Sequence, residues 1–229
     1  MHGVRMKIIS IVGSPRGKRS NTGRLLEEVL KGARHAGAAN ETILLKTDSV
    51  RPCLGCDKCH KTGRCPQKDE FESVKGKILS ADALVLASPN YIFNVSAQMK
   101  AFMDRCCGIL HCLAFEGKYG AAIVTSGGGD EKPITTYMNH FLIATGISPV
   151  GDLGVTMGNL VNEEFTDEIQ GQAFALGERL VRAWKGQKRS KIVDKKIAAF
   201  KARMEWLISY RKQDWPYEYD YWRSHRGLK

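Results

Sequence analysis

Four of the seven cysteines in this 229-residue chain lie within thirteen residues. Cys53, Cys56, Cys59 and Cys65 are spaced C-x2-C-x2-C-x5-C, so three thiols share one spacing and the fourth follows a short segment that contains a glycine. Thiolates three residues apart in a tight turn can converge on one centre, as in the bacterial run C-x2-C-x2-C-x3-C-P. The spacing predicts a [4Fe-4S] cluster in the loop 53–65.

Three other states of these thiols stay open. Zinc sites usually pair two C-x-x-C knuckles across a longer insert, which this run lacks. Disulfides need an oxidising compartment, and nothing in the chain indicates one. Free thiols without a metal are the simplest alternative, because motif matches include false positives. His60 could replace one ligand, although four cysteines already suffice.

A run of polar residues between positions 13 and 22 follows the first predicted strand and leads into a helix. It reads Gly-Ser-Pro-Arg-Gly-Lys-Arg-Ser-Asn-Thr. Hydroxyls, an amide and backbone N–H groups at the positive end of a helix dipole are suited to bind a phosphate. The run is neither a Walker A loop nor the G-x-G-x-x-G of dinucleotide folds. The alternative is that Ser20 or Asn21 only caps the helix.

Two further loops with ligand-binding chemistry follow predicted strands. Residues 88–96 read Ser-Pro-Asn-Tyr-Ile-Phe-Asn-Val-Ser, and such aromatic and amide groups can pack on a flat ring and hydrogen-bond its edge. Residues 125–130 read Thr-Ser-Gly-Gly-Gly-Asp, and glycines let a backbone approach a ligand closely. All three loops would lie at the carboxyl ends of strands, where open α/β sheets bind ligands.

The elements that must position these loops alternate along the chain. Strands are predicted at residues 7–12, 41–46, 83–87, 120–125 and 150–155, and helices at 25–33, 71–79, 96–107, 134–145 and 163–184. The strands are apolar without strict alternation, which indicates burial on both faces. We therefore predict an α/β fold, a doubly wound five-stranded parallel sheet.

The charge of the chain is unevenly distributed. The net charge is +11, and residues 185–229 contribute +8 of it through 13 Lys and Arg against 5 Asp and Glu. All four tryptophans lie within residues 184–229. We expect a domain of residues 1–186 and a basic, aromatic C-terminal arm of residues 187–229. The first residues do not resemble a signal peptide and no apolar run could span a bilayer, so we expect a cytoplasmic protein without a membrane partner.

The arm has apolar residues at helical spacing between positions 193 and 208, followed by an aromatic end at 215–222. A free arm would expose a large hydrophobic surface to water. We expect it to dock on a neighbouring subunit, with Trp206, Trp215, Tyr217 and Trp222 as anchors. Packing on its own domain and contact with a redox partner are alternatives, and nucleic-acid binding is the least favoured.

Other residues with reactive side chains are assigned to structure. Cys106, Cys107 and Cys112 are expected to be small buried hydrophobic residues. His111 and His140 have no partner in a recognisable motif. Asp104 and Arg105 end a predicted helix, and we expect them to pair at a subunit surface.

Several motifs together resemble a known family. The runs 13–16 and 20–22, the run 88–91 and the run 98–105 resemble the NADPH-dependent FMN reductase branch of the flavodoxin-like superfamily, and the four cysteines make the chain similar to the iron-sulfur flavoproteins. The resemblance covers residues 6–185 and not the arm. It implies a flavodoxin-like fold, and it places the FMN phosphate on Ser14, Arg16, Ser20, Asn21 and Thr22. It places the ring against Pro89, Asn90, Tyr91, Ile92, Phe93, Asn94, Ser126, Gly127 and Gly128.

The resemblance also implies a function and an assembly. We expect an FMN-dependent oxidoreductase or electron-transfer flavoprotein with a [4Fe-4S] cluster, in a homodimer or homotetramer. Flavin takes a hydride or single electrons and a cluster takes one at a time, so the pair can link two-electron and one-electron partners without a catalytic side chain. A cluster-free NAD(P)H-dependent FMN or quinone reductase and a non-enzymatic electron carrier are the alternatives. NAD(P)H is one candidate donor, and the acceptor is a redox protein or a small molecule.

Overall fold

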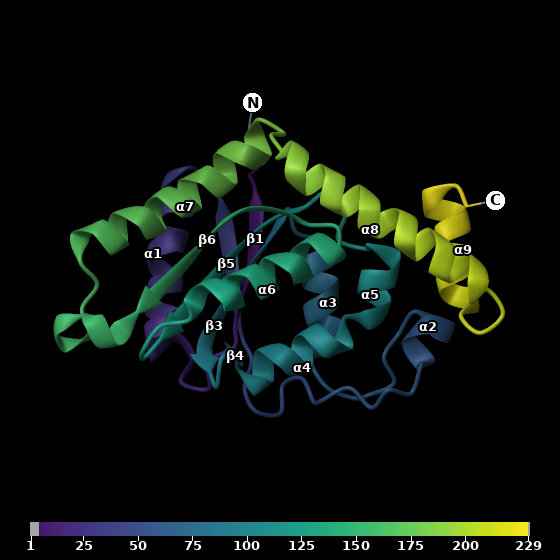
Figure 1. Ribbon diagram of the computed structural model, residues 1–229, viewed down its shortest axis with the longest axis horizontal. Helices are drawn as coiled ribbons and strands as arrows, with labels where there is room; N and C mark the ends of the chain where they lie inside the picture. Colours follow the sequence, from purple (N-terminus) through teal and green to yellow (C-terminus); the bar gives the residue numbers. More distant parts are fainter. Residues whose placement is uncertain (1–4, 229) are drawn as a thin grey trace.

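The computed structural model describes residues 5–228, and a parallel sheet lies at its centre (Figure 1). The strand order is β2-β1-β3-β5-β6, and a two-residue strand, β4, pairs antiparallel with the end of β3. The strands are β1 (Lys7–Val12), β2 (Ala39–Leu44), β3 (Ala83–Tyr91), β4 (Asn94–Val95), β5 (Tyr119–Ser126) and β6 (Ser148–Thr156). Counted without β4, this is the order 2-1-3-4-5 of flavodoxin-like folds. The predicted five-stranded parallel sheet is confirmed.

Helices cover both faces of the sheet, because the central strands bury side chains on both sides. On one face, α1 (Asn21–His35) and α7 (Asp167–Lys185) pack on β1, β3 and β5. On the other lie α3 (Phe71–Leu79), α4 (Ala97–Arg105) and α6 (Glu131–Ala144). The helices α1 and α7 approach closely at Gly177, where a Cβ would lie 1.9 Å from the carbonyl oxygen of Val29. Only glycine fits at that crossing.

The predicted helix 96–107 is interrupted in the structure. It divides at Cys106, whose backbone leaves the helical conformation, into α4 and α5 (Cys107–Cys112). A short helix inside the cysteine loop, α2 (Lys58–Thr62), was not predicted. The strand predicted at 41–46 lies two residues earlier, at β2. None of the helices within residues 5–228 is both long and apolar enough to cross a membrane.

The C-terminal arm forms α8 (Lys191–Tyr210) and α9 (Pro216–Arg226), which fold back along the domain beside α6, α5 and α2 (Figure 1). Its apolar stripe joins a third core cluster that contains Leu113, Ile143, Ile208 and Trp222. Trp222 is 1% exposed, and its Nε1 donates to the carbonyl oxygen of His111 at 3.0 Å.

The expectation that the arm docks on a neighbouring subunit is therefore wrong for its buried anchors. Trp222 and Trp215 pack on the arm's own chain, and Tyr217 covers Gly63 in the cysteine loop. Trp206 is 67% exposed and stacks on Tyr210 instead. The apolar pattern showed that the arm covers a surface, but it contained no information about which copy of the chain supplies that surface.

Candidate functional site

The three polar loops meet at the carboxyl edge of the sheet, where β1 and β3 are neighbours. Gly13 N–H donates to the carbonyl oxygen of Ala87 at 2.8 Å, and Ser96 Oγ donates to the carbonyl oxygen of Gly13 at 2.5 Å. The hydroxyls of Thr22 and Thr125 are hydrogen-bonded at 2.6 Å. The loop after β1 is thus tied to the loops after β3 and β5, and the structure brings the predicted site residues together at one edge.

Within the first loop, the structure gives several predicted phosphate residues partners inside the protein. Ser20 is the N-cap of α1: its Oγ accepts from Gly23 N–H at 3.0 Å and donates to the carbonyl oxygen of Gly17 at 2.6 Å. Thr22 is buried against Thr125. The side-chain amide of Asn21 donates to Glu163 at 2.9 Å.

Fewer groups of the first loop remain available to bind a ligand. The guanidinium of Arg16 is exposed, whereas Ser14 is 3% exposed and its hydroxyl accepts a long 3.3 Å bond from Arg16 N–H. The first amides of a helix have no partner inside the helix, and its positive dipole end favours anions. The N-terminus of α1, with Ser14 and Arg16 beside it, thus retains the chemistry of a phosphate site.

The loop after β3 is a two-residue hairpin with an unusual sequence. Tyr91 pairs with Asn94, and the residues between them, Ile92 and Phe93, have φ angles of 48° and 60°. Two positive φ angles are typical of a type I′ turn, which prefers Asn-Gly and disfavours a β-branched residue. Both apolar side chains are nonetheless exposed, by 90% for Ile92 and 75% for Phe93. Strained residues of this kind cluster at binding sites, where the side chains they present are needed.

The loop after β5 lies opposite the hairpin. The side-chain amide of Asn90 donates to the carbonyl oxygen of Gly129 at 3.0 Å, while its Oδ1 is buried without a hydrogen-bond partner in residues 5–228. Ser126 Oγ accepts from Gly129 N–H at 2.8 Å and also contacts Glu131. Burial would raise the pKa of Glu131, but hydrogen bonds from Ser126 and Thr156 outweigh burial and lower it. Asn90 Oδ1 is thus an unused acceptor, and the space around the backbone of Gly127 is open to a ligand.

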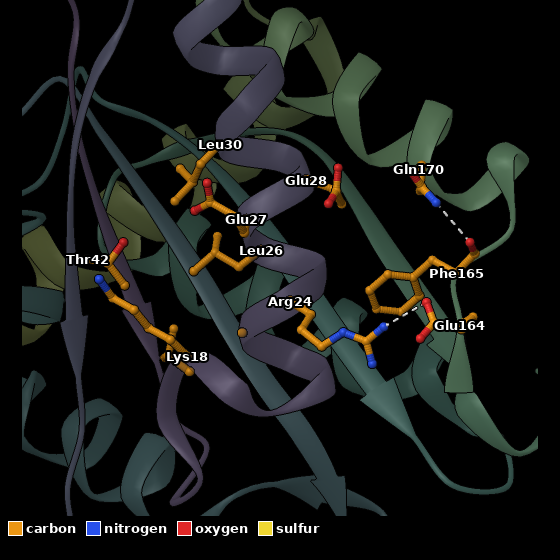
Figure 2. Close-up of a pocket in the computed structure, with 12 residues that line it drawn as sticks. Lys18, Arg24, Leu26, Glu27, Glu28, Leu30, Thr42, Glu164, Phe165 and Gln170 are labelled. Carbon is orange, nitrogen blue, oxygen red and sulfur yellow. Dashed lines mark hydrogen bonds and ion pairs between the residues drawn. The ribbon is translucent and has the colours of Figure 1, made fainter. Parts of the chain in front are cut away.

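A separate cavity lies beside the first turns of α1 and contains none of the predicted site residues. Figure 2 shows Arg24 reaching from α1 to Glu164, above the ring of Phe165. Glu27 and Glu28 also line this cavity. Lys18 and Arg24 line it as well, so its acidic and basic groups nearly balance, and what separates it from the proposed phosphate site is that none of the predicted site residues lines it.

The cysteine loop connects β2 to α3 and contains four free thiols. Cys53 and Cys56 are exposed, and Cys59 and Cys65 are half-buried. Gly55, Asp57 and Gly63 have φ angles of 60°, 57° and 73°, so the backbone curls repeatedly, and such left-handed turns form the concave amide surfaces common at iron-sulfur sites. Four thiols in a strongly turned loop fit a cluster by donor type. Within residues 5–228, no three of these thiols form a close group of metal-ligating atoms.

The base of this loop is closed by a buried ion pair. Arg105 lies 2.7 Å from Asp69 Oδ2 and also donates to the carbonyl oxygen of Arg51 at 2.9 Å, which joins the two ends of the loop. Burial opposes ionisation of Asp69, but hydrogen bonds from Arg105 and from backbone amides lower its pKa. The expectation that Arg105 pairs at a subunit surface is wrong, because its side chain is buried within its own chain. Asp104 pairs with Lys100 on the surface of α4.

A cluster that the sequence analysis did not predict lies between the loop and the arm. His60, Cys107 and His111 each offer a metal-ligating atom, all within 4.8 Å of one another, and no other set of this kind occurs within residues 5–228. The expectation that Cys107 is only a buried hydrophobic residue is wrong, and so is the expectation that His111 has no partner. Their i, i+4 spacing on one helix was the available sign. Cys106 and Cys112 are buried as expected.

Glu218 of α9 is fully buried beside this cluster, and its carboxylate is hydrogen-bonded to His60 and His111. Burial would raise its pKa, but hydrogen bonds from His111 and His60 lower it, so it is an anion. Hydrogen bonds from the same two imidazoles lower the pKa of the Cys107 thiol to about 6. Burial would lower the pKa of both histidines, and their bonds to Cys107 and Glu218 raise it instead.

The fold and the position of these loops define a class of protein. An open sheet of this strand order with polar loops where β1 meets β3 is a flavodoxin-like α/β protein. Two solved structures agree with this class: RosB, with bound 8-demethyl-8-formylriboflavin-5′-phosphate, has a TM-score of 0.62 at 15% identity and covers 85% of this chain and 86% of that chain. A flavodoxin from the domain Archaea has a TM-score of 0.52 at 18% identity, over 79% of this chain and 99% of that one. At these identities the similarity shows the fold alone.

The sequence comparisons then show the family. The model of the family described as NADPH-dependent FMN reductase matches residues 6–161, and the chain belongs to this family. An iron-sulfur flavoprotein of Archaeoglobus fulgidus is 34% identical over 223 residues, covering 96% of this chain and 98% of that protein. An iron-sulfur flavoprotein of Methanocaldococcus jannaschii is 37% identical over 150 residues, 64% of this chain and 77% of that one. The predicted resemblance is confirmed, and the chain is a flavin-dependent oxidoreductase.

The comparisons correct one statement about the arm. The similarity was expected to end at residue 185, yet the relative from Archaeoglobus fulgidus is matched over 96% of this chain. The matched region therefore extends well into α8 and α9. The arm is a feature that this chain shares with at least one relative.

Proposed function

We propose that this chain binds FMN at the carboxyl edge of β1, β3 and β5 and holds a [4Fe-4S] cluster in the loop 53–65. The observation that favours FMN most is the hydrogen-bonded junction of three loops beside the N-terminus of α1. FMN has one terminal phosphate, which one helix N-terminus suits, and the sequence contains no second nucleotide motif. In this proposal the flavodoxin-like domain is residues 1–186, and residues 187–229 are an arm that covers the cysteine loop.

The proposed flavin contacts divide by their chemistry. Arg16, Ser14 and the first amides of α1 hold the phosphate, and the Asn21 amide would have to exchange its bond to Glu163 for one to the phosphate. Hairpin residues 89–94 cover one side of the ring, and residues 126–128 provide close backbone on the opposite side. The unused Oδ1 of Asn90 is an acceptor for an N–H group at the ring edge. FMN, when bound, accepts a hydride or single electrons, and the protein binds it, orients it and tunes its potential.

The proposed cluster ligands are Cys53, Cys56, Cys59 and Cys65. Two relatives are named as iron-sulfur flavoproteins, and the loop offers four free thiols on a turned backbone. Because no three of these thiols form a close group in this structure, cluster binding would have to draw the loop cysteines together. A cluster-free NAD(P)H-dependent reductase is the second candidate, and the exposure of Cys53 and Cys56 is the observation that favours it.

We propose that NAD(P)H or an iron-sulfur protein supplies electrons and that the chain forms a homodimer or homotetramer. The family description names NADPH, which supports the first donor. Exposed Ile92 and Phe93 on the hairpin, and exposed Trp206 and Tyr210 on α8, are apolar groups that a second copy could cover. Sedimentation equilibrium of the full chain measures the assembly, and a monomer at micromolar concentration contradicts it.

The flavin site is tested by comparing two arginines of the same loop. Arg16 and Arg19 are both exposed and have no ion pair within the described residues, so replacing either removes one positive charge. We expect Arg16→Ala to weaken FMN binding about tenfold, because a charge-assisted hydrogen bond contributes roughly 1.5 kcal/mol. Arg19→Ala should change affinity by no more than about twofold, as for a screened surface charge. Equal losses in a fluorescence titration would mean that the loop attracts anions without a specific contact.

A further inference from the structure

Two histidines and a cysteine from separate elements point their ligand atoms at one another beneath the arm. His60 comes from α2, and Cys107 and His111 come from successive turns of α5. Their ligand atoms all lie within 4.8 Å of one another. We propose that these three residues bind one divalent transition-metal ion, and Zn²⁺ is the ion that a thiolate with two imidazoles suits best.

A buried carboxylate holds both histidines in the orientation that a metal requires. Nδ1 of His60 donates to Oε1 of Glu218 at 2.6 Å, and Nδ1 of His111 donates to Oε2 at 2.9 Å. The free nitrogen of each ring is therefore Nε2. Ligating histidines almost always donate their other ring N–H to a carboxylate or carbonyl in this way, which fixes the tautomer and raises ligand basicity.

The distances agree with a tetrahedral site. Zn–S bonds of about 2.3 Å and Zn–N bonds of about 2.0–2.1 Å place sulfur and nitrogen ligands about 3.6 Å apart. The distance from Cys107 Sγ to His111 Nε2 is 3.8 Å. Two nitrogen ligands would lie about 3.4 Å apart, so His60, whose ligand atom is within 4.8 Å of the others, has to approach by no more than about 1.4 Å.

A fourth position is available beside His60. Asp57 Oδ1 lies 3.9 Å from His60 Nε2, and the Asp57 side chain is 60% exposed. Either this carboxylate or a water molecule can therefore complete the coordination. Three protein ligands with a variable fourth position is the arrangement of zinc sites that are not purely structural.

The cluster is also enclosed by neighbouring side chains. Glu218 is fully buried, the imidazole of His60 is 6% exposed, and the ring of Trp215 covers both imidazoles at centroid distances of 4.8 and 4.9 Å.

The site would join the cysteine loop, the domain and the arm at one point. His60 belongs to the loop, Cys107 and His111 to the domain, and Glu218 to the arm. Metal binding should therefore strengthen docking of α9, because the orienting carboxylate is fixed only when the arm is in place. The proposal concerns ligands other than the four loop cysteines and needs no bound flavin, so it can fail while the proposed function stands.

The test uses Co²⁺ as a spectroscopic probe on the full chain. Replacing Cys53, Cys56, Cys59 and Cys65 with Ala removes the loop thiols, including Cys59 beside His60, and leaves the proposed ligands intact. We expect this background to bind one equivalent of Co²⁺, with visible bands of a four-coordinate ion and one thiolate charge-transfer band. Adding Cys107→Ala should abolish the thiolate band and weaken binding at least about 100-fold. Adding Glu218→Gln should weaken it about 10- to 100-fold while the band persists.

Cys112→Ala is the matched control, because Cys112 is a buried thiol on the same helix outside the cluster. It should leave the Co²⁺ spectrum and affinity unchanged. Circular dichroism checks the fold of each variant, and Cys107→Ser replaces Cys107→Ala if the latter unfolds. The proposal is overturned if the background binds no Co²⁺ at 100 µM or keeps its thiolate band without Cys107. It is also overturned if Cys107→Ser in the otherwise native chain depletes iron as Cys65→Ala does, since Cys107 would then belong to the cluster.

Discussion

Replacing Ile92-Phe93 by Asn-Gly separates the effect of this hairpin on stability from its effect on flavin binding. In this structure both residues have positive φ angles, 48° and 60°. An L-residue in that region costs roughly 1–2 kcal/mol, and Asn-Gly at these two positions of a type I′ turn removes most of the cost. Because the native side chains are 90% and 75% exposed, the substitution loses little packing within the chain.

The magnitude for the flavin-free protein follows from these terms. Relief of strain at two positions should raise the free energy of unfolding by about 2 kcal/mol. For a chain of 150–250 residues, 1 kcal/mol corresponds to roughly 2–4 °C in Tm, so we expect an increase of about 4–8 °C. Differential scanning calorimetry of the flavin-free protein measures it.

The same substitution should weaken flavin binding. If Ile92 and Phe93 cover about 100 Å² of apolar ring surface, their loss removes about 2.5 kcal/mol at roughly 25 cal/mol per Å², or about 60-fold in Kd. Ile192→Ala on α8 is the control, because Ile192 is also exposed, by 69%, and lies on the arm. Ile192→Ala should change neither the Tm of the flavin-free protein nor the FMN affinity by much. A variant with lower Tm and native FMN affinity would refute the reasoning, since the strained residues would then serve the fold.

Three further predictions concern charges and the arm. Glu163→Gln should tighten FMN binding about 2- to 5-fold in fluorescence titration, because it removes the negative charge beside the Asn21 amide. Weaker binding would show that the contact between Glu163 and Asn21 orders the site. Asp69→Asn should cost about 3–5 kcal/mol in urea unfolding at pH 7, because it leaves a buried arginine unpaired. The pKa of Asp69 is lower in the folded protein, so this ion pair contributes to the free energy of unfolding above pH ~4 and loses its contribution as pH falls through the folded pKa. The stabilities of the native protein and of Asp69→Asn should therefore converge at low pH. A difference that stays constant with pH would contradict the ion pair. Trp222→Ala should lower the free energy of unfolding by about 3–5 kcal/mol and make α9 accessible to proteases. Because Trp206 is exposed, Trp206→Ala should lower it by less than about 0.5 kcal/mol. Equal losses of stability would contradict the docking of the arm on its own domain.

Local pattern was sufficient for the sheet and for the loops at its edge. The runs 83–87 and 121–124 are apolar at every position, and this signal depends only on neighbours in the chain. Because parallel strands share one carboxyl edge, the order of elements also placed the loops after β1, β3 and β5 together. The strain at Ile92 could not be predicted, since Ile-Phe is not a recognised turn sequence.

Contacts between distant segments were beyond the sequence pattern. Glu218 meets His60 across 158 positions, and Arg105 meets Asp69 across 36. Neither pair has a spacing that a helix or strand would reveal. The arm showed an amphipathic stripe, but docking on its own α5 and α6 follows from the surface those helices leave uncovered, which only the folded domain displays.

The central claim is that this family member carries FMN and a [4Fe-4S] cluster together. Analysis of one anaerobic preparation for released flavin, iron and acid-labile sulfide tests it most directly. We predict FMN near one per chain, with iron and sulfide each at about four per chain. FAD in place of FMN, or FMN with neither iron nor sulfide, would contradict the claim.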